Sequence, residues 1–217
     1  MNLTAITDPE QAARLHMLDS AALLLCADFQ GEKTLIDVGT GAGLPGLPLK
    51  FWSPPSRSPC WTAGQAGGLA QPGVRPAGAG GIQAIHARAE EQALVKGYRD
   101  SFDFVTARAV ANLRLLGELC LPYVKVGGQF LAMKTTESAS EVEEAAHCIK
   151  LLGARLEECR DYTIPGTDVI HRLVACGRWP QPEGLSPAVG QDPESPAVRP
   201  ERCLRQPPRI DTLSVQG

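Results

Sequence analysis

A glycine-rich segment, Asp37 to Gly46, places the strongest constraint on what this chain can fold into. It reads Asp-Val-Gly-Thr-Gly-Ala-Gly-Leu-Pro-Gly. Residues 34–38 have the apolar pattern of a short buried strand, and a helix is expected after the loop. Glycines at 39, 41 and 43 allow sharp turns and a close approach of the backbone to a ligand. In α/β proteins such a loop lies at the carboxyl end of the sheet, near the topological switch point where ligands bind.

Two ligand classes use a strand, a glycine loop and a helix in this order: dinucleotides and S-adenosylmethionine. The spacing G-x-G-x-G differs from the G-x-G-x-x-G of dinucleotide-binding loops, which weakens the case for a nicotinamide-dependent oxidoreductase. An acidic residue at the start of the loop, here Asp37, is typical of S-adenosylmethionine-dependent methyltransferases. A glycine-rich turn that binds no ligand remains the structural alternative.

The rest of the ordered sequence alternates between strands and helices. Thr7 and Glu10 fit a capping box for a helix that reaches about Asp28. Further strands are expected at 102–106, 129–134, 155–164 and 169–176, a turn at Gly127-Gly128, and helices at 111–121 and from Ser140 to Gly153. This order predicts an α/β fold with a mostly parallel sheet, and the last two strands predict an antiparallel edge.

Two windows interrupt this pattern. Residues 53–81 contain seven glycines and five prolines, and residues 178–217 contain eight prolines. Because proline and glycine at this density break helices and strands alike, both windows are expected to be irregular, and the second to be a disordered tail. No Asp or Glu stands between Asp37 and Glu90.

Charge, hydropathy and cysteine usage exclude several classes of protein. The net charge of −3 does not suit a basic nucleic-acid-binding tail protein. The sequence has no apolar run long enough for a membrane span and no signal-peptide pattern, so a cytoplasmic location is expected. The cysteines number seven, with no C-x-x-C pair, which predicts reduced, mostly buried thiols and no metal site.

Several motifs in order resemble the RsmG family, also called glucose-inhibited division protein B. The resemblance covers about residues 2–52 and 82–176. The motifs are Asn2–Ile6, His16–Ser20, Asp37–Gly46, Ala87–Glu91, Thr106–Ala111, Gly127–Lys134 and Leu156–Ala175. It implies a Rossmann-like class I S-adenosylmethionine-dependent methyltransferase fold. It also implies methylation of guanine N7 in 16S ribosomal RNA, with the RNA or the small ribosomal subunit as partner and a monomeric, metal-free enzyme.

The resemblance also implies roles for individual residues. Asp37, Gly39, Gly41 and Leu44 would form the cofactor loop. Ala89 and Glu90 would match the pair that flanks the adenine, and Arg108 would face the cofactor and the target pocket. Lys134 could contact an RNA phosphate. No catalytic residue is expected, because guanine N7 has an unshared electron pair and no proton to remove.

Each of these residues also has a structural interpretation. Asp37 could serve only to hold the loop backbone, and Glu90 could be a solvated carboxylate at a helix start. Arg108 could pair with Asp103 or Glu118 on the surface. His16 and Asp19 lie three residues apart, and we interpret them as a structural pair on a helix face.

The chain departs from the family pattern in three places. Residues 1–30 form a helical segment that looks truncated, residues 31–177 form the methyltransferase domain, and residues 178–217 replace a short basic terminus. Within the domain, 53–81 takes the place of a second strand that ends in an acidic residue for the cofactor ribose. Retained length and an altered composition suggest the hypothesis that these windows are translated out of frame. We therefore predict weak binding of S-adenosylmethionine, and the alternative function is that of an inactive or non-enzymatic homologue.

Overall fold

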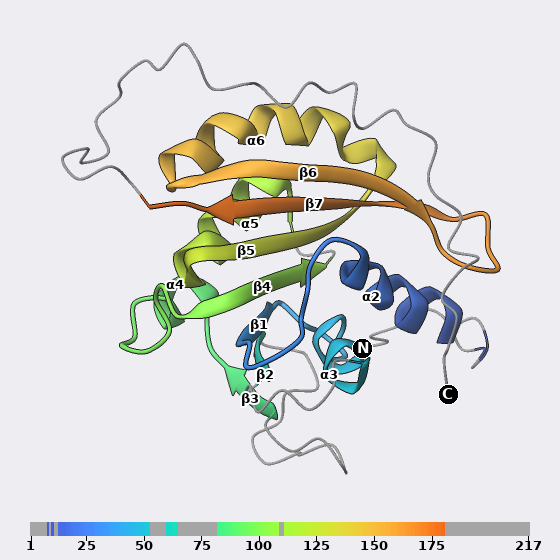
Figure 1. Ribbon diagram of the computed structural model, residues 1–217, viewed down its shortest axis with the longest axis horizontal. Helices are drawn as coiled ribbons and strands as arrows, with labels where there is room; N and C mark the ends of the chain where they lie inside the picture. Colours follow the sequence, from blue (N-terminus) through green and yellow to red (C-terminus); the bar gives the residue numbers. More distant parts are fainter. Residues whose placement is uncertain are drawn as a thin grey trace.

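A computed structural model describes residues 8, 10, 13–52, 82–108 and 111–180, and the backbone of residues 60–64. One sheet in the order β3-β2-β1-β4-β5-β7-β6 forms its centre (Figure 1). Its strands are β1 (Leu35–Val38), β2 (Cys60–Gly64), β3 (Ile82–His86), β4 (Phe102–Arg108), β5 (Val124–Thr135), β6 (Ala154–Thr163) and β7 (Ile170–Arg178). The first five strands are parallel, whereas β7 is antiparallel to both β5 and β6. The predicted α/β fold with an antiparallel edge is confirmed.

Helices cover both faces of this sheet (Figure 1). One face carries α4 (Ala89–Gln92), α5 (Leu113–Cys120) and α6 (Ala139–Leu151), whose apolar residues join one buried cluster. The other face carries an N-terminal helical segment and α3 (Gly46–Trp52), which contribute to a second cluster. That segment consists of a π-helical stretch (Ala13–Leu18), α2 (Asp19–Ala21) and a 3-10 turn (Ala22–Leu25). Short 3-10 turns at Leu121–Tyr123 and Thr136–Ser138 complete the elements.

Successive side chains along a strand point to opposite faces of the sheet, so β1, β4, β5 and β7 each contribute residues to both clusters. In β5, Phe130 and Ala132 belong to the first cluster, and Leu131 and Met133 belong to the second. Phe102 and Phe104 in β4 lie two residues apart but belong to opposite clusters. The pairing of β4 with β5 shifts register between these two residues, and this irregularity explains the change of face.

Several expectations from the sequence are wrong in detail. The window 53–81 contains β2, which pairs with β1 and β3, so the second strand of the sheet is present. No strand is predicted from the sequence at Ile82–His86, where the structure has β3. Gly127 and Gly128 lie inside β5 rather than in a turn before it.

Of the other predicted elements, some are confirmed, some differ in detail and some lie outside the described residues. Residues 13–25 are helical but irregular, and the proposed cap at Thr7 lies outside the described residues. The same holds for the tail beyond residue 180. The expected helix after the glycine loop is confirmed as α3. None of the helices that the structure describes is long and apolar enough to cross a membrane.

Candidate functional site

The candidate site lies at the carboxyl edge of the parallel strands. The glycine loop follows β1, Arg108 ends β4, and α4 begins shortly after β3. Since parallel strands end at the same edge, residues far apart in the sequence meet there. The order β2-β1-β4 makes the gap between β1 and β4 the switch point of the sheet.

Asp37, the third residue of β1, is hydrogen-bonded to the far end of the glycine loop. Its carboxylate is fully buried and accepts hydrogen bonds from the Gly46 backbone N–H at 3.0 Å and from the Thr106 hydroxyl at 2.9 Å. Burial raises the pKa of Asp37 to about 6, although these hydrogen bonds and the nearby Arg108 charge oppose that rise. The carboxylate thus joins the start of the loop to its end and to β4.

The loop itself uses backbone conformations that favour glycine. Gly39, Gly41 and Gly43 all have positive φ angles, of 74°, 55° and 92°. A Cβ at Gly43 would lie 2.2 Å from the Leu47 side chain, which would have to shift, so both packing and the positive φ favour glycine there. At Gly41 no described atom lies within 4 Å of a built Cβ, so the loop faces open space there. Leu44 is buried beneath the loop, with its N–H bonded to the Thr40 carbonyl.

Arg108 does not pair with Asp103 or Glu118. Its Nη1 lies 3.3 Å from Oδ2 of Asp19, and its Nη2 lies 3.4 Å from Nδ1 of His16. Its side chain is 18% exposed, whereas that of Asp19 is only 2% exposed. His16 and Asp19 therefore both contact Arg108 at the end of β4 instead of pairing with each other. The N-terminal helical segment thus lines one side of the site.

Two further residues complete this group and were missed from the sequence. Tyr162 in β6 donates its hydroxyl hydrogen bond to Oδ1 of Asp19, and Nδ1 of His171 in β7 lies 2.9 Å from the same oxygen. Burial, followed by the Asp19 charge, raises the pKa of Tyr162 well above its usual range. Both residues lie within the motif Leu156–Ala175, but nothing local in the sequence links them to Asp19.

Lys134 near the end of β5 has partners within the protein. Its Nζ lies 2.7 Å from the Glu141 carboxylate and donates to the Ala111 carbonyl at 2.9 Å. Glu141 in turn accepts from the Leu113 N–H at the start of α5. Lys134 therefore has protein partners rather than solvent around its amino group. Together with Glu141 it holds the chain at Ala111 and the start of α5 in place.

Ala89 and Glu90 occupy the start of α4. Ala89 is buried in the first cluster, and its carbonyl accepts a hydrogen bond from the Tyr123 hydroxyl at 2.6 Å. Glu90 is exposed, and its carboxylate lies 2.6 Å from Nη2 of Arg88. Its pKa is lowered by a backbone N–H hydrogen bond and by Arg88. Among the described residues, the side-chain hydrogen bonds and the ion pair of these two positions go to Tyr123 and Arg88 rather than to the glycine loop or Arg108.

The chain lacks an acidic residue at the end of β2, where a bound nucleoside would use one. No acidic residue stands between Asp37 and Glu90, so neither β2, which ends at Gly64, nor the chain that follows it up to Ala89 supplies a carboxylate. The open space at Gly41 suits a nucleoside ligand, but the sequence lacks the acidic residue after the second strand that accepts from the ribose hydroxyls in such sites.

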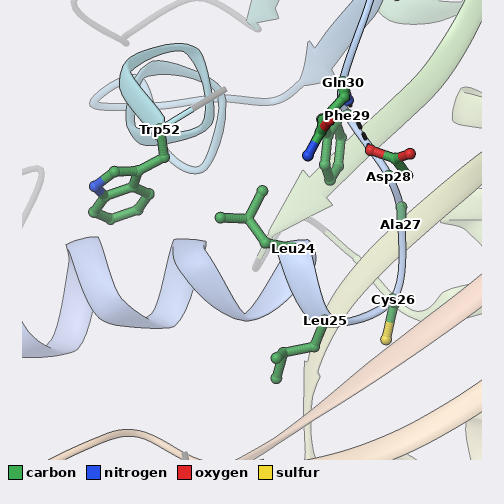
Figure 2. A pocket seen from close by; sticks show the side chains of 8 residues that line it. All are labelled: Leu24, Leu25, Cys26, Ala27, Asp28, Phe29, Gln30 and Trp52. Atoms are coloured by element: carbon green, nitrogen blue, oxygen red, sulfur yellow. Dashed lines mark hydrogen bonds between the residues drawn. The ribbon is translucent and has the colours of Figure 1, made fainter. Parts of the chain in front are cut away.

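A cavity of about 560 Å³ lies elsewhere, between the end of the N-terminal helical segment and Trp52 (Figure 2). Leu24, Phe29 and Trp52 are among the residues that line it. Because α3 begins at the glycine loop and ends at Trp52, this cavity is at the far end of that helix from the loop. It does not contribute to the candidate site.

The chemistry available at this edge is binding and electrostatic. The described residues hold no group of three histidine, cysteine or acidic side chains placed to bind a metal ion. Two buried carboxylates organise this edge: Asp37 holds the glycine loop, and Asp19 contacts the Arg108 guanidinium and the His171 ring. Such a set suits a reaction in which the protein positions a nucleotide and a small cofactor.

Comparison with known proteins places the chain in context. The family described as GidB, rRNA small subunit methyltransferase G, matches residues 1–57 and 78–165, and leaves 58–77 unmatched. The ribosomal RNA small subunit methyltransferase G of Lachnoclostridium phytofermentans is 37% identical over 201 residues, which cover 92% of this chain and 83% of that protein. The protein of the same name from Lactobacillus johnsonii is 40% identical over 177 residues, covering 80% and 74%.

Solved structures share the fold at much lower identity. An S-adenosylmethionine-dependent methyltransferase from Aquifex aeolicus is 15% identical, with a TM-score of 0.54 over 78% of this chain and 93% of that one. Aeropyrum pernix fibrillarin, solved with natively bound S-adenosyl-L-methionine, is 13% identical, with a TM-score of 0.54 over 74% and 76%. These likenesses confirm the Rossmann-like methyltransferase fold.

Proposed function

The chain belongs to the rRNA small subunit methyltransferase G family, and from this premise we propose that it methylates guanine N7 in 16S ribosomal RNA with S-adenosylmethionine as donor. The observation that carries the proposal is the family match, which includes the glycine loop, Arg108 and Lys134. The nicotinamide-dependent alternative is not retained.

We assign the donor to the glycine loop at the switch point. Gly39 and Gly41 let it approach the backbone, Leu44 supports the loop from inside, and Asp37 holds the loop in shape without reaching the ligand. Ala89 and Glu90 flank the adenine from the start of α4. When bound, S-adenosylmethionine supplies a methyl group on a positively charged sulfur.

The protein's task in this reaction is positioning. Guanine N7 offers a lone pair and carries no proton, so no side chain has to act as a general base. Methyl transfer would form the N7–methyl bond as the donor's carbon–sulfur bond breaks, and the positive charge would pass from sulfur to the guanine. Alignment of the reacting atoms at roughly 3–3.5 Å supplies the rate enhancement.

The partner is 16S ribosomal RNA, alone or within the small subunit, and we propose a monomer that acts in the cytoplasm. The net charge of −3 gives no long-range attraction to RNA, so binding depends on local groups such as Arg108. We assign the methyltransferase domain to residues 31–177. We further assign residues 1–30, of which 13–25 are helical, to an N-terminal segment, and residues 178–217 to a tail.

A methyl-transfer assay on small subunits from a strain that lacks the modification tests this function. We expect label from the donor to appear at a single guanine of 16S ribosomal RNA. Purified chain that binds the subunit but transfers no label would favour the second candidate, an inactive homologue. The missing acceptor at the end of β2 is the observation behind that candidate.

A further inference from the structure

We propose that Asp19 is a positioning residue that orients the Arg108 guanidinium toward the target nucleotide. This inference rests on the proposed function, because it assigns the target side of the same site. It gives the N-terminal helical segment a role in substrate placement, in addition to covering one face of the sheet.

The geometry around Asp19 is that of a fixed acceptor. Oδ2 faces Nη1 of Arg108 at 3.3 Å, while Oδ1 receives the Tyr162 hydroxyl and lies 2.9 Å from Nδ1 of His171. The side chain is 2% exposed, so water does not compete for these bonds. Contacts from β6 and β7 thus determine the carboxylate's orientation, and the carboxylate determines that of Arg108.

His16 completes the orientation from a second direction. A guanidinium can only donate, so the contact of 3.4 Å between Nη2 and Nδ1 makes Nδ1 the acceptor, and the proton resides on Nε2. Burial, followed by the Arg108 charge, lowers the pKa of His16, which keeps the ring neutral, although Asp19 acts in the opposite direction. Neutral His16 can therefore accept from Arg108 at neutral pH.

Arg108 retains donors for a ligand. Guanidinium groups carry five N–H bonds, and the two contacts described above use one from each terminal nitrogen. The side chain is 18% exposed at the carboxyl end of β4, beside the loop that follows β1. The remaining N–H groups suit the oxygen atoms of a nucleotide, either a phosphate or the O6 atom of guanine.

An isosteric substitution separates orientation from packing. Asp19→Asn keeps the shape of the side chain but places an NH₂ group among donors, which frees Arg108 to rotate. We expect this variant to lower kcat for subunit methylation at least tenfold and to weaken binding of a 16S RNA transcript. Arg108→Ala should show both losses, and the double variant should be no worse than Arg108→Ala alone.

Asp161→Asn provides the matched control. Asp161 pairs with buried Arg172 through two contacts of 2.6 and 2.8 Å, and it touches neither Asp19 nor Arg108 in the described structure. We expect it to lower the melting temperature at least as much as Asp19→Asn does, yet to keep kcat within twofold at 25 °C. Equal losses of kcat in both variants would mean that stability, not orientation, is responsible, and would overturn the inference.

Non-additivity is the decisive readout. If the losses from Asp19→Asn and Arg108→Ala multiply, Asp19 acts independently of Arg108 and the inference is wrong. Should Asp19→Asn fail to fold, Tyr162→Phe replaces it, with an expected threefold or larger loss that disappears in the Arg108→Ala background.

The binding measurement keeps the two proposals apart. Wild-type chain that binds RNA but transfers no methyl group refutes the proposed activity, while a non-additive pattern in binding still supports the role of Asp19. Wild-type chain that binds neither the RNA transcript nor the small subunit overturns both.

Discussion

Asp37 illustrates how much one buried carboxylate can determine. Its bonds to the Gly46 N–H and the Thr106 hydroxyl connect the two ends of the glycine loop with β4. A buried charge is costly unless it is hydrogen-bonded, and burial raises the pKa of Asp37 while its hydrogen bonds act in the opposite direction. The residue that begins the motif therefore acts through the shape of the loop.

This raised pKa predicts a pH dependence of stability. The pKa of Asp37 is about 6 in the folded chain against an ordinary value of 3.8, so the folded state binds more protons between these values. Its contribution to the free energy of unfolding should fall by about 3 kcal/mol as the pH rises through this window. Urea unfolding of wild type and Asp37→Asn from pH 4 to pH 7 measures the difference. Parallel curves for the two proteins would contradict the prediction.

Gly41 allows a test of the loop as a ligand site. With φ at 55° and open space around a built Cβ, Gly41→Ala should cost about 1 kcal/mol of stability and obstruct the donor. Gly31→Ala is the control, because Gly31 also has a positive φ and open space but lies before β1. Equilibrium dialysis with labelled S-adenosylmethionine should show at least tenfold weaker binding only for Gly41→Ala. Equal binding by both variants would remove the loop from the donor site.

Strand β5 shows how an element can override a local turn signal. Gly127 and Gly128 predicted a turn, yet both lie in the strand that pairs with β4 and β7. Gly127 supplies a positive φ of 82°, whereas Gly128 lies against the β4 backbone. The two glycines therefore serve the strand for different reasons, one conformational and one steric.

Replacing each glycine with alanine separates these reasons. A Cβ at Gly128 would lie 2.7 Å from the Asp103 carbonyl oxygen, so Gly128→Ala should cost about 2–3 kcal/mol. Gly127→Ala meets no atom within 4 Å and should cost only about 1 kcal/mol for its backbone conformation. Urea unfolding at one pH compares them. A larger loss for Gly127→Ala would contradict the steric account.

The molecule as a whole combines a complete sheet with an incomplete ligand edge. The described residues form one seven-stranded sheet, and it includes β2, which lies in a window that the sequence pattern predicts to be irregular. What is missing is a carboxylate after β2, since the sequence has none between Asp37 and Glu90. Weak donor binding stays a prediction, and it now depends on this missing group rather than on a missing strand.

Donor affinity tests that prediction directly. We expect wild-type chain to bind S-adenosylmethionine more weakly than the low-micromolar range in calorimetric titration. Gly64→Asp adds a carboxylate at the end of β2 and should strengthen binding about tenfold, because hydrogen bonds to a charged group contribute about 1.5–3 kcal/mol. Gly64→Asn is the uncharged control and should leave the affinity near that of wild type. Low-micromolar binding by wild type would show that the ribose needs no such acceptor.

The sequence alone determined the features that depend on neighbouring residues. The glycine spacing predicted the loop after β1, alternating strands and helices predicted the sheet, and ordered motifs indicated the family. These features are local because backbone conformation and apolar periodicity are properties of short segments.

Only the tertiary structure decided which side chains contact one another at the site. Asp19, Arg108, Tyr162 and His171 come from four elements and meet only because the β4, β6 and β7 strands lie in one sheet beneath the N-terminal segment. Strand β2 likewise forms because it pairs with β1 on one side and β3 on the other. This pairing uses main-chain hydrogen bonds, which do not require an apolar side-chain pattern, so the sequence pattern does not predict the strand.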